Sequence, residues 1–435
     1  MLQLAAAAPL AGGLVPHAAA QQPGPGPADA PADHTLRIGI GLVELGHDTI
    51  VSTKLYSGSF PGPLLRLTEG KQVVVDVHND TDTPEQLHWH GMFLPGDVDG
   101  AAEESTPFIP PHGMRRIAFT PLPAGFRFYH THTHAGSDLT AGSYSGQVGL
   151  VYVESRSNPG AFDREVFITL KEFGPFLTRT EMPDDFLAPT REVPELRAAS
   201  EAAVKEALKR GRSEGFELGY SFFAVNGRML GQGEPIRVKP GERLLLHVLN
   251  ASASEIRSLA LPGHVFKVVA LDGNPVPHPT AVPVLWLGPA ERVCAVVEMK
   301  HPGIWVMGDT NDEDRDRGMG IVVEYAGRKG KPQWQKPPAF RWDYRRFGTL
   351  GAAAAAPDET VQLTFAARVG ARDGFDEFTI NDVAFSMGSM DPLLRLRHGT
   401  RYRLHMRNAT DDTHPTICTG TASSLPPSPA CRRRA

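Results

Sequence analysis

The sequence has few cysteines, few clustered basic residues and few long apolar runs. Its three cysteines, Cys294, Cys418 and Cys431, are too few for a disulfide framework. The net charge of -5 argues against a nucleic-acid-binding protein, because no positive field is present to neutralise phosphates. Beyond the N-terminal region no apolar run is long enough to span a bilayer. We therefore expect no nucleic-acid partner and no membrane span.

The N-terminal region resembles an export signal. Residues 2–20 are rich in alanine, leucine and glycine and end in small residues, although a basic segment before them is missing. Residues 21–34 are rich in proline and alanine, which is typical of a disordered lead-in. The sequence thus predicts an exported protein, periplasmic or secreted, whose true start lies upstream.

Glycine and proline, by contrast, are abundant. The 435 residues include 44 glycines and 38 prolines without a short repeat, which favours many short strands and turns over long helices. The exception is residues 195–210, which follow Pro194 and end at Gly211 and which we predict to form a surface helix.

A longer repeat divides the chain into similar units. In each unit a proline and an apolar strand lead to a glycine, and a second alternating strand then ends at an asparagine nine residues after that glycine. The three pairs are Gly70 and Asn79, Gly241 and Asn250, and Gly399 and Asn408. A period of about 160 residues indicates tandem duplication of a whole β-domain. Each asparagine begins an Asn-x-Ser/Thr triplet, which is an acceptor pattern for glycosylation. Because the asparagine recurs at the same position of each repeat, we favour a structural role in a turn over glycosylation.

We therefore predict an all-β fold of tandem Greek-key, cupredoxin-like sandwiches, two complete and a third incomplete, with the one surface helix in the second domain. The expected divisions are a signal and lead-in at 1–34, domain 1 at 35–157, domain 2 at 158–327, a linker at 328–356 and a truncated domain 3 at 357–435.

Two histidine doublets in the first unit are the strongest chemical signal. They are His88-Trp89-His90 and His130-Thr131-His132. Alternate side chains of a strand face the same way, so two neighbouring strands of this kind direct four imidazoles to one point. Imidazole suits copper, zinc, iron or nickel, and neither doublet contains a cysteine or carboxylate that would narrow the choice.

With these doublets and the later Thr413-His414-Pro415, the sequence resembles the three-domain, laccase-like multicopper oxidases. The resemblance implies a trinuclear copper cluster between the first and last domains and a mononuclear blue copper in the last. By the family motif, His88 would bind the single cluster copper, and His90, His130 and His132 the coupled pair, with His414 as a ligand from the last domain. His134 lies outside the motif and is left out.

The resemblance also implies the partners and the reaction. A phenolic or metal-ion donor would be oxidised one electron at a time, and oxygen would be reduced to water by four electrons. Asp99, in the Asp99-Gly100 step, is similar to the family's acidic residue near the cluster and is a candidate proton donor, with a plain turn carboxylate as the alternative. The second unit has Arg257-Ser258-Leu259 where the first has its doublet, so we expect a spacer domain without copper.

The third unit departs from the family. The His-Cys-His segment that supplies most of a blue-copper site is absent, and the histidine motif breaks after Pro415. Translated one base earlier with permitted codons, residues 416–425 can give His-His-Leu-His-Arg-His-Ser-Phe-Glu-Leu, which restores the motif. We predict that residues 416–435 are out-of-frame translation and that the printed chain is catalytically incomplete; the alternative is a natural, unrelated tail.

Two other functions stay open from the sequence. One is a non-enzymatic copper-binding or copper-tolerance protein that keeps the four histidines. The other is a zinc hydrolase, in which a His-x-His doublet is also common but which needs a carboxylate base and an open metal position.

Overall fold

The computed structural model of the chain describes residues 31–101, 105–135, 138–155, 162–179, 216–349, 356–372, 375–384, 393–397, 399–410 and 414. Nearly all regular structure in these ranges is β-strand, and the α-helices found there are short, α1 (Gly96–Asp99) and α3 (Asp312–Asp316). The predicted all-β class is confirmed. The helix predicted at 195–210 lies outside the described residues. Within the described ranges, no helix has the length and apolar character needed to cross a bilayer.

The first group of strands forms two facing four-stranded sheets. One has the order β2 (Thr49–Tyr56), β1 (His34–Gly46), β4 (Val73–Asn79), β6 (Met114–Phe119). The other has the order β3 (Gly62–Thr68), β8 (Val148–Glu154), β7 (Gly125–His130), β5 (His88–His90). Every second residue of β4 is buried, as its alternating sequence predicts, and the three buried valines among them join a core that includes Trp89 and Tyr129.

The second group repeats this plan with larger sheets. A six-stranded sheet has the order β10 (Phe216–Val225), β9 (Arg164–Arg179), β12 (Arg243–Asn250), β17 (Arg292–Glu298), β14 (Phe266–Leu271), β15 (Asn274–Val282). A five-stranded sheet has the order β11 (Ile236–Val238), β19 (Gly320–Tyr325), β18 (Ile304–Gly308), β13 (Arg257–Ala260), β16 (Val284–Leu287). In the third group the described strands form one sheet, β22 (Val383–Ala384), β21 (Phe375–Ile380), β20 (Glu359–Arg372), β23 (Tyr402–Asn408).

The sequence repeat corresponds to a repeated strand pairing. In each group a long first strand pairs antiparallel with the next strand and parallel with the strand that ends at the repeat asparagine: β1 with β4, β9 with β12, β20 with β23. The repeat glycines, Gly70, Gly241 and Gly399, have φ of 73°, 82° and 77°, values that side chains other than glycine rarely adopt.

The repeat asparagines close the same turn in all three groups. The side-chain oxygen of each accepts a hydrogen bond from the backbone N–H two residues later, at 3.0, 3.0 and 2.9 Å for Asn79, Asn250 and Asn408. Asn79 and Asn250 are fully buried. The predicted structural turn role is confirmed.

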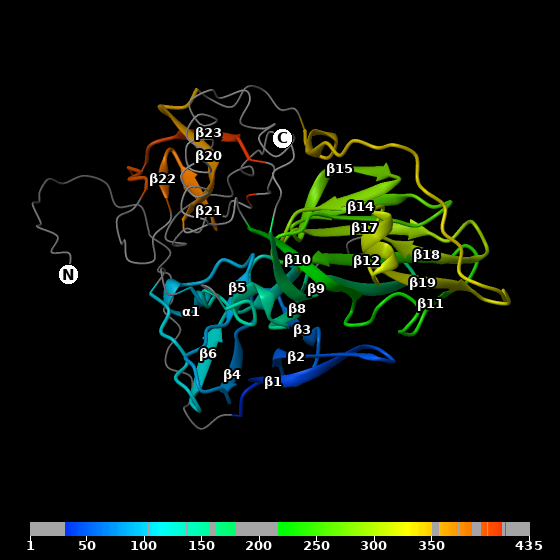
Figure 1. Cartoon of the computed structure of the whole chain (residues 1–435), viewed down its shortest axis with the longest axis horizontal. Helices are drawn as coiled ribbons and strands as arrows, with labels where there is room; N and C mark the ends of the chain where they lie inside the picture. Colours follow the sequence, from blue (N-terminus) through cyan, green and yellow to red (C-terminus); the bar gives the residue numbers. More distant parts are fainter. Residues whose placement is uncertain are drawn as a thin grey trace, which may run out of the picture.

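The first and second groups share an apolar interface. Phe126, Phe128 and Leu150 of the first group lie in one buried cluster with Leu245 and Cys294 of the second. In Figure 1, β8 of the first group accordingly lies beside β9 of the second. The strands that carry the histidine doublets are therefore adjacent to this interface.

Candidate metal centre

The four histidines of the doublets converge at one end of the second sheet of the first group. β5 pairs antiparallel with β7, so that His88 lies directly opposite His130. Ring centroids lie 5.5 Å apart for His88 and His90, 5.3 Å for His88 and His130, and 5.2 Å for His88 and His132. One ligand atom each from His88, His90 and His130 lies within 4.8 Å of the others. The predicted convergence is confirmed, although β7 ends at His130 and His132 follows it.

Hydrogen bonds fix which ring nitrogens remain free to bind an ion. The Nδ1–H of His88 donates to the backbone oxygen of Asp99 at 2.9 Å and lies 3.1 Å from its carboxylate. The Nδ1–H of His130 donates to the Thr131 oxygen at 2.6 Å. Both assignments follow from the acceptors, and they leave the Nε2 lone pairs of both rings for a ligand.

The remaining contact in this group is between two nitrogens. His90 Nδ1 faces His130 Nε2 at 3.3 Å. Since the His130 proton is on Nδ1, the Nδ1–H of His90 can donate to the Nε2 lone pair of His130, and a bound cation would take the place of this proton. A set of neutral imidazoles arranged in this way fits a metal ion of the copper and zinc class.

Burial favours the neutral form of two of these imidazoles, His90 and His130. His88 and His90 are only 6% and 7% exposed. Desolvation holds the pKa of His90 and of His130 well below the ordinary histidine value, and neighbouring positive groups add to the shift. The unprotonated form is the one that binds a metal.

Neighbouring residues hold the rings in place. The Phe128 ring stacks on His90, with centroids 4.3 Å apart, and on His130 at 5.1 Å. Asp99 ends α1, and the next residue, Gly100, has φ of 102°. A Cβ at Gly100 would lie 2.0 Å from the Leu87 oxygen, so only glycine allows α1 to approach His88 this closely.

Sequence comparison identifies the family. Residues 43–158 and residues 197–324 each match a family described as multicopper oxidase, and together the matches cover more than half of the chain. This chain belongs to the multicopper oxidase family. Copper is therefore the cofactor that the family implies, and oxygen and a reducing substrate are what multicopper oxidases use.

Similar proteins include multicopper oxidase MmcO of Mycobacterium tuberculosis, 29% identical over 86% of this chain and 72% of that protein. Copper resistance protein A of Escherichia coli is 26% identical over 60% of this chain, which spans 45% of that protein. Among solved structures, a multi-copper oxidase of Pseudomonas thermotolerans has a TM-score of 0.57 at 24% identity, covering 87% of this chain and 82% of that chain. The blue copper oxidase of Nitrosomonas europaea has a TM-score of 0.54 at 23% identity, covering 67% of this chain and 85% of that chain. Both structures support the fold.

Behind the histidines, this multicopper oxidase carries a buried ion pair that the sequence analysis missed. The Glu85 side chain is fully buried and lies 2.6 Å from Lys54 Nζ. Its other oxygen accepts from Gln147 Nε2 at 3.1 Å and from Thr131 Oγ1 at 3.5 Å. Because Thr131 separates His130 from His132, Glu85 braces the segment that carries both rings.

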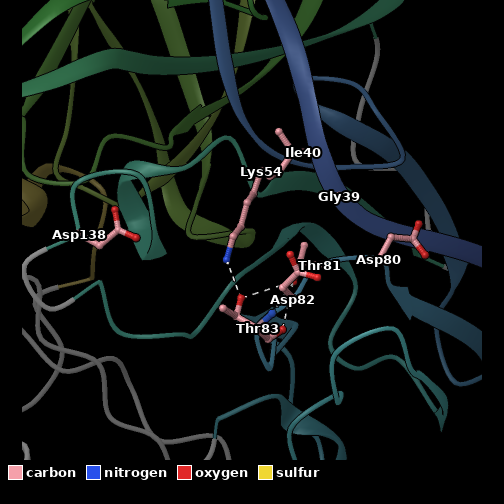
Figure 2. A pocket seen from close by; sticks show the side chains of 8 residues that line it. All are labelled: Gly39, Ile40, Lys54, Asp80, Thr81, Asp82, Thr83 and Asp138. Atoms are coloured by element: carbon pink, nitrogen blue, oxygen red, sulfur yellow. Dashed lines mark hydrogen bonds between the residues drawn. The ribbon is translucent and has the colours of Figure 1, made fainter.

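Lys54 connects this pair to the surface. It lines a pocket together with Gly39, Ile40, Asp80, Thr81, Asp82, Thr83 and Asp138. Figure 2 shows the lysine extended to Thr83, whose hydroxyl accepts from Nζ at 3.1 Å. A lone acidic residue three positions before a doublet gives no sequence signal of this contact.

His414 and His134 are also among the described residues. The His414 ring stacks on Phe365 at 5.4 Å, and its Nε2 lies 2.6 Å from Thr410 Oγ1. His134, which was left out of the ligand set, is exposed. Residues 416–435, including Cys418 and Cys431, lie outside the described residues.

In the second group, the strand corresponding to β5 carries ion pairs. Arg257 at the start of β13 is fully buried and lies 2.5 Å from the Asp314 carboxylate. The Ser258 hydroxyl donates to Asp309 at 2.7 Å. Position by position, this multicopper oxidase thus places a guanidinium and a hydroxyl in the second group where the first has imidazoles.

Proposed function

We propose that His88, His90, His130 and His132 bind copper and that the chain is by family a copper-dependent oxidase of phenolic or metal-ion donors, catalytically incomplete as printed. The observation that carries the proposal is the convergence of four imidazoles on one point, of which His90 and His130 are held neutral by desolvation. Copper held there supplies one-electron redox chemistry, through which a donor is oxidised and oxygen is reduced to water. By the family motif, His88 holds the single cluster copper, the other three hold the coupled pair, and His414 is a further ligand.

The protein's own residues orient the ligands and exclude water. Asp99 keeps the proton of His88 on Nδ1, which directs Nε2 to the ion. The same carboxylate, 14% exposed and 3.1 Å from His88 Nδ1, is the candidate proton donor of the site. Phe128 blocks rotation of His90 and His130 by stacking on both rings.

The proposal extends to the organisation of the chain. Cupredoxin domains at 35–157, 158–327 and 357–435 agree with the three groups of strands, and the alanine-rich residues 2–20 support export to the periplasm or beyond. We further propose that residues 416–435 are read out of frame, which would leave the blue-copper site incomplete. Sequencing the gene through the Pro415 codon tests this; an intact frame with no family-like alternative would refute it.

A second candidate is a copper-binding protein without oxidase activity, since similar proteins include copper resistance protein A. Metal analysis and oxygen uptake by the copper-loaded full chain separate the candidates. Several coppers, intense blue absorption and oxygen consumption with a phenol or a metal-ion donor are expected of a complete oxidase. Copper without blue colour or oxygen consumption supports the binding protein or the incomplete oxidase, and bound zinc in place of copper would contradict both.

A further inference from the structure

One side chain of the second group reaches the histidines of the first. Arg292 begins β17 and is only 3% exposed. Its Cζ lies 5.3 Å from the centroid of the Phe128 ring, whose own centroid lies 4.3 Å from that of His90. Gly91 provides the room, since a Cβ there would lie 2.6 Å from Arg292 Nη2.

This guanidinium is buried with incomplete compensation. Its nearest carboxylate oxygen, from Asp272, is 3.3 Å away on a side chain that is 48% exposed. Nη1 donates to the Ala290 oxygen at 2.8 Å and Nη2 to the Asp272 backbone oxygen at 3.2 Å. The Nε–H has no acceptor among the described residues. A buried cation with an unused donor destabilises the fold, so its retention calls for another explanation.

A second buried cation adds to the charge. Arg127, 1% exposed, donates to the Asp272 backbone oxygen and, at 2.9 Å, to the Asn274 side chain. Burial and the charge of Arg292 lower its pKa to about 10, so it is still protonated at neutral pH. Asp272 faces both guanidinium groups, and the buried Glu291 also acts on Arg292. The Arg292 guanidinium itself lies against the Phe128 ring that stacks on His90.

We propose that Arg292 is a positioning residue that the second group contributes to the copper site, where it braces Phe128 and favours Cu(I) over Cu(II). The inference rests on the proposed copper binding. A fixed positive charge repels a doubly charged ion about twice as strongly as a singly charged one at the same place. One-electron reduction of the bound ion thus becomes more favourable, and a unit without copper ligands still tunes the site.

The test compares dissociation constants in the full chain. Wild type, Arg292→Gln and Arg292→Lys are titrated with Cu(II) alone and, without oxygen, with Cu(I) kept reduced by ascorbate. The ratio of Kd for Cu(I) to Kd for Cu(II) should rise about tenfold in R292Q, while R292K keeps it near the wild-type value. Arg237→Gln is the matched control, because it removes one charge from the exposed ion pair of Arg237 with Glu234. Arg237 lies on β11, on the opposite side of the second group from β5 in Figure 1.

Asp272→Asn should shift the ratio of dissociation constants in the opposite direction, and it provides a second test if R292Q does not fold. It removes the compensating carboxylate, so the ratio should fall. A ratio that stays at the wild-type value in both R292Q and D272N, with only the melting temperature lowered, would show that Arg292 merely holds the two groups together. If R292Q does not fold, D272N with an unchanged or increased ratio overturns the inference by itself. Wild type that binds neither ion refutes the proposed function, which is a distinct result.

Discussion

Replacing Glu85 with glutamine removes the charge that balances Lys54 inside the first group. The glutamate is fully buried, and besides Lys54 it accepts hydrogen bonds from Gln147 and Thr131. Glutamine has nearly the same shape and can keep one acceptor. The variant therefore isolates the loss of charge from the creation of a cavity.

The expected cost follows from the burial of both partners. Removing one member of a fully buried ion pair costs about 3–5 kcal/mol, because the other charge is left uncompensated. Lys54 is 19% exposed and keeps its hydrogen bond to Thr83, so water and the hydroxyl screen part of its charge. We expect E85Q to lower the free energy of unfolding by about 2–3 kcal/mol.

Glu154→Gln is the matched control, because it makes the same chemical change in an exposed pair. Glu154 and Arg66 are 45% and 43% exposed, a setting in which ion pairs contribute less than about 1 kcal/mol. Urea unfolding followed by circular dichroism gives the midpoint and slope for both variants. Hydrogen exchange of residues 128–132 should increase in E85Q only. Equal losses in the two variants would refute the structural role assigned to Glu85.

Three further predictions concern other contacts. Hydrogen bonds with His247 and with Arg66 lower the pKa of Glu165 to about 2, so Glu165→Gln should reduce stability at neutral pH. A depressed carboxyl pKa stabilises the fold only above that pKa. The difference in melting temperature between E165Q and wild type should therefore close as pH falls from about 4.5 to about 2 in a series of thermal melts. Gly100→Ala should destabilise far more than Gly327→Ala, since both have positive φ but only Gly100 meets backbone atoms, and comparable melting temperatures would contradict the tight approach of α1. Asp99→Ala should weaken copper binding about tenfold in a chelator competition while the metal-free protein melts as wild type does, and unchanged affinity would remove Asp99 from the site.

Local features of this fold were predictable because they follow from backbone geometry. The glycine and asparagine of each repeat occupy conformations that few residues tolerate, so their spacing identifies equivalent turns in all three groups. The alternation in each histidine doublet likewise depends only on the pleat of a strand, which is why the convergence of the rings followed from the sequence.

Contacts between distant segments were not predictable in this way. Glu85 finds Lys54 and Gln147 through strand order, and Arg292 reaches Phe128 only because the two groups pack through a shared apolar cluster. Neither residue belongs to a periodic pattern. His134, an apparent extension of the doublet, lies past the end of β7, and its side chain is exposed.

The central claim is that four converging imidazoles of the first group bind copper, and a copper count tests it most directly. Full-length wild type, the double variant His90→Ala/His130→Ala and His134→Ala are loaded with copper, freed of excess metal and measured by mass spectrometry of the metal. Wild type and H134A should retain the same amount of copper, and the double variant should lose most of it. Retention at the wild-type level in the double variant would contradict the account.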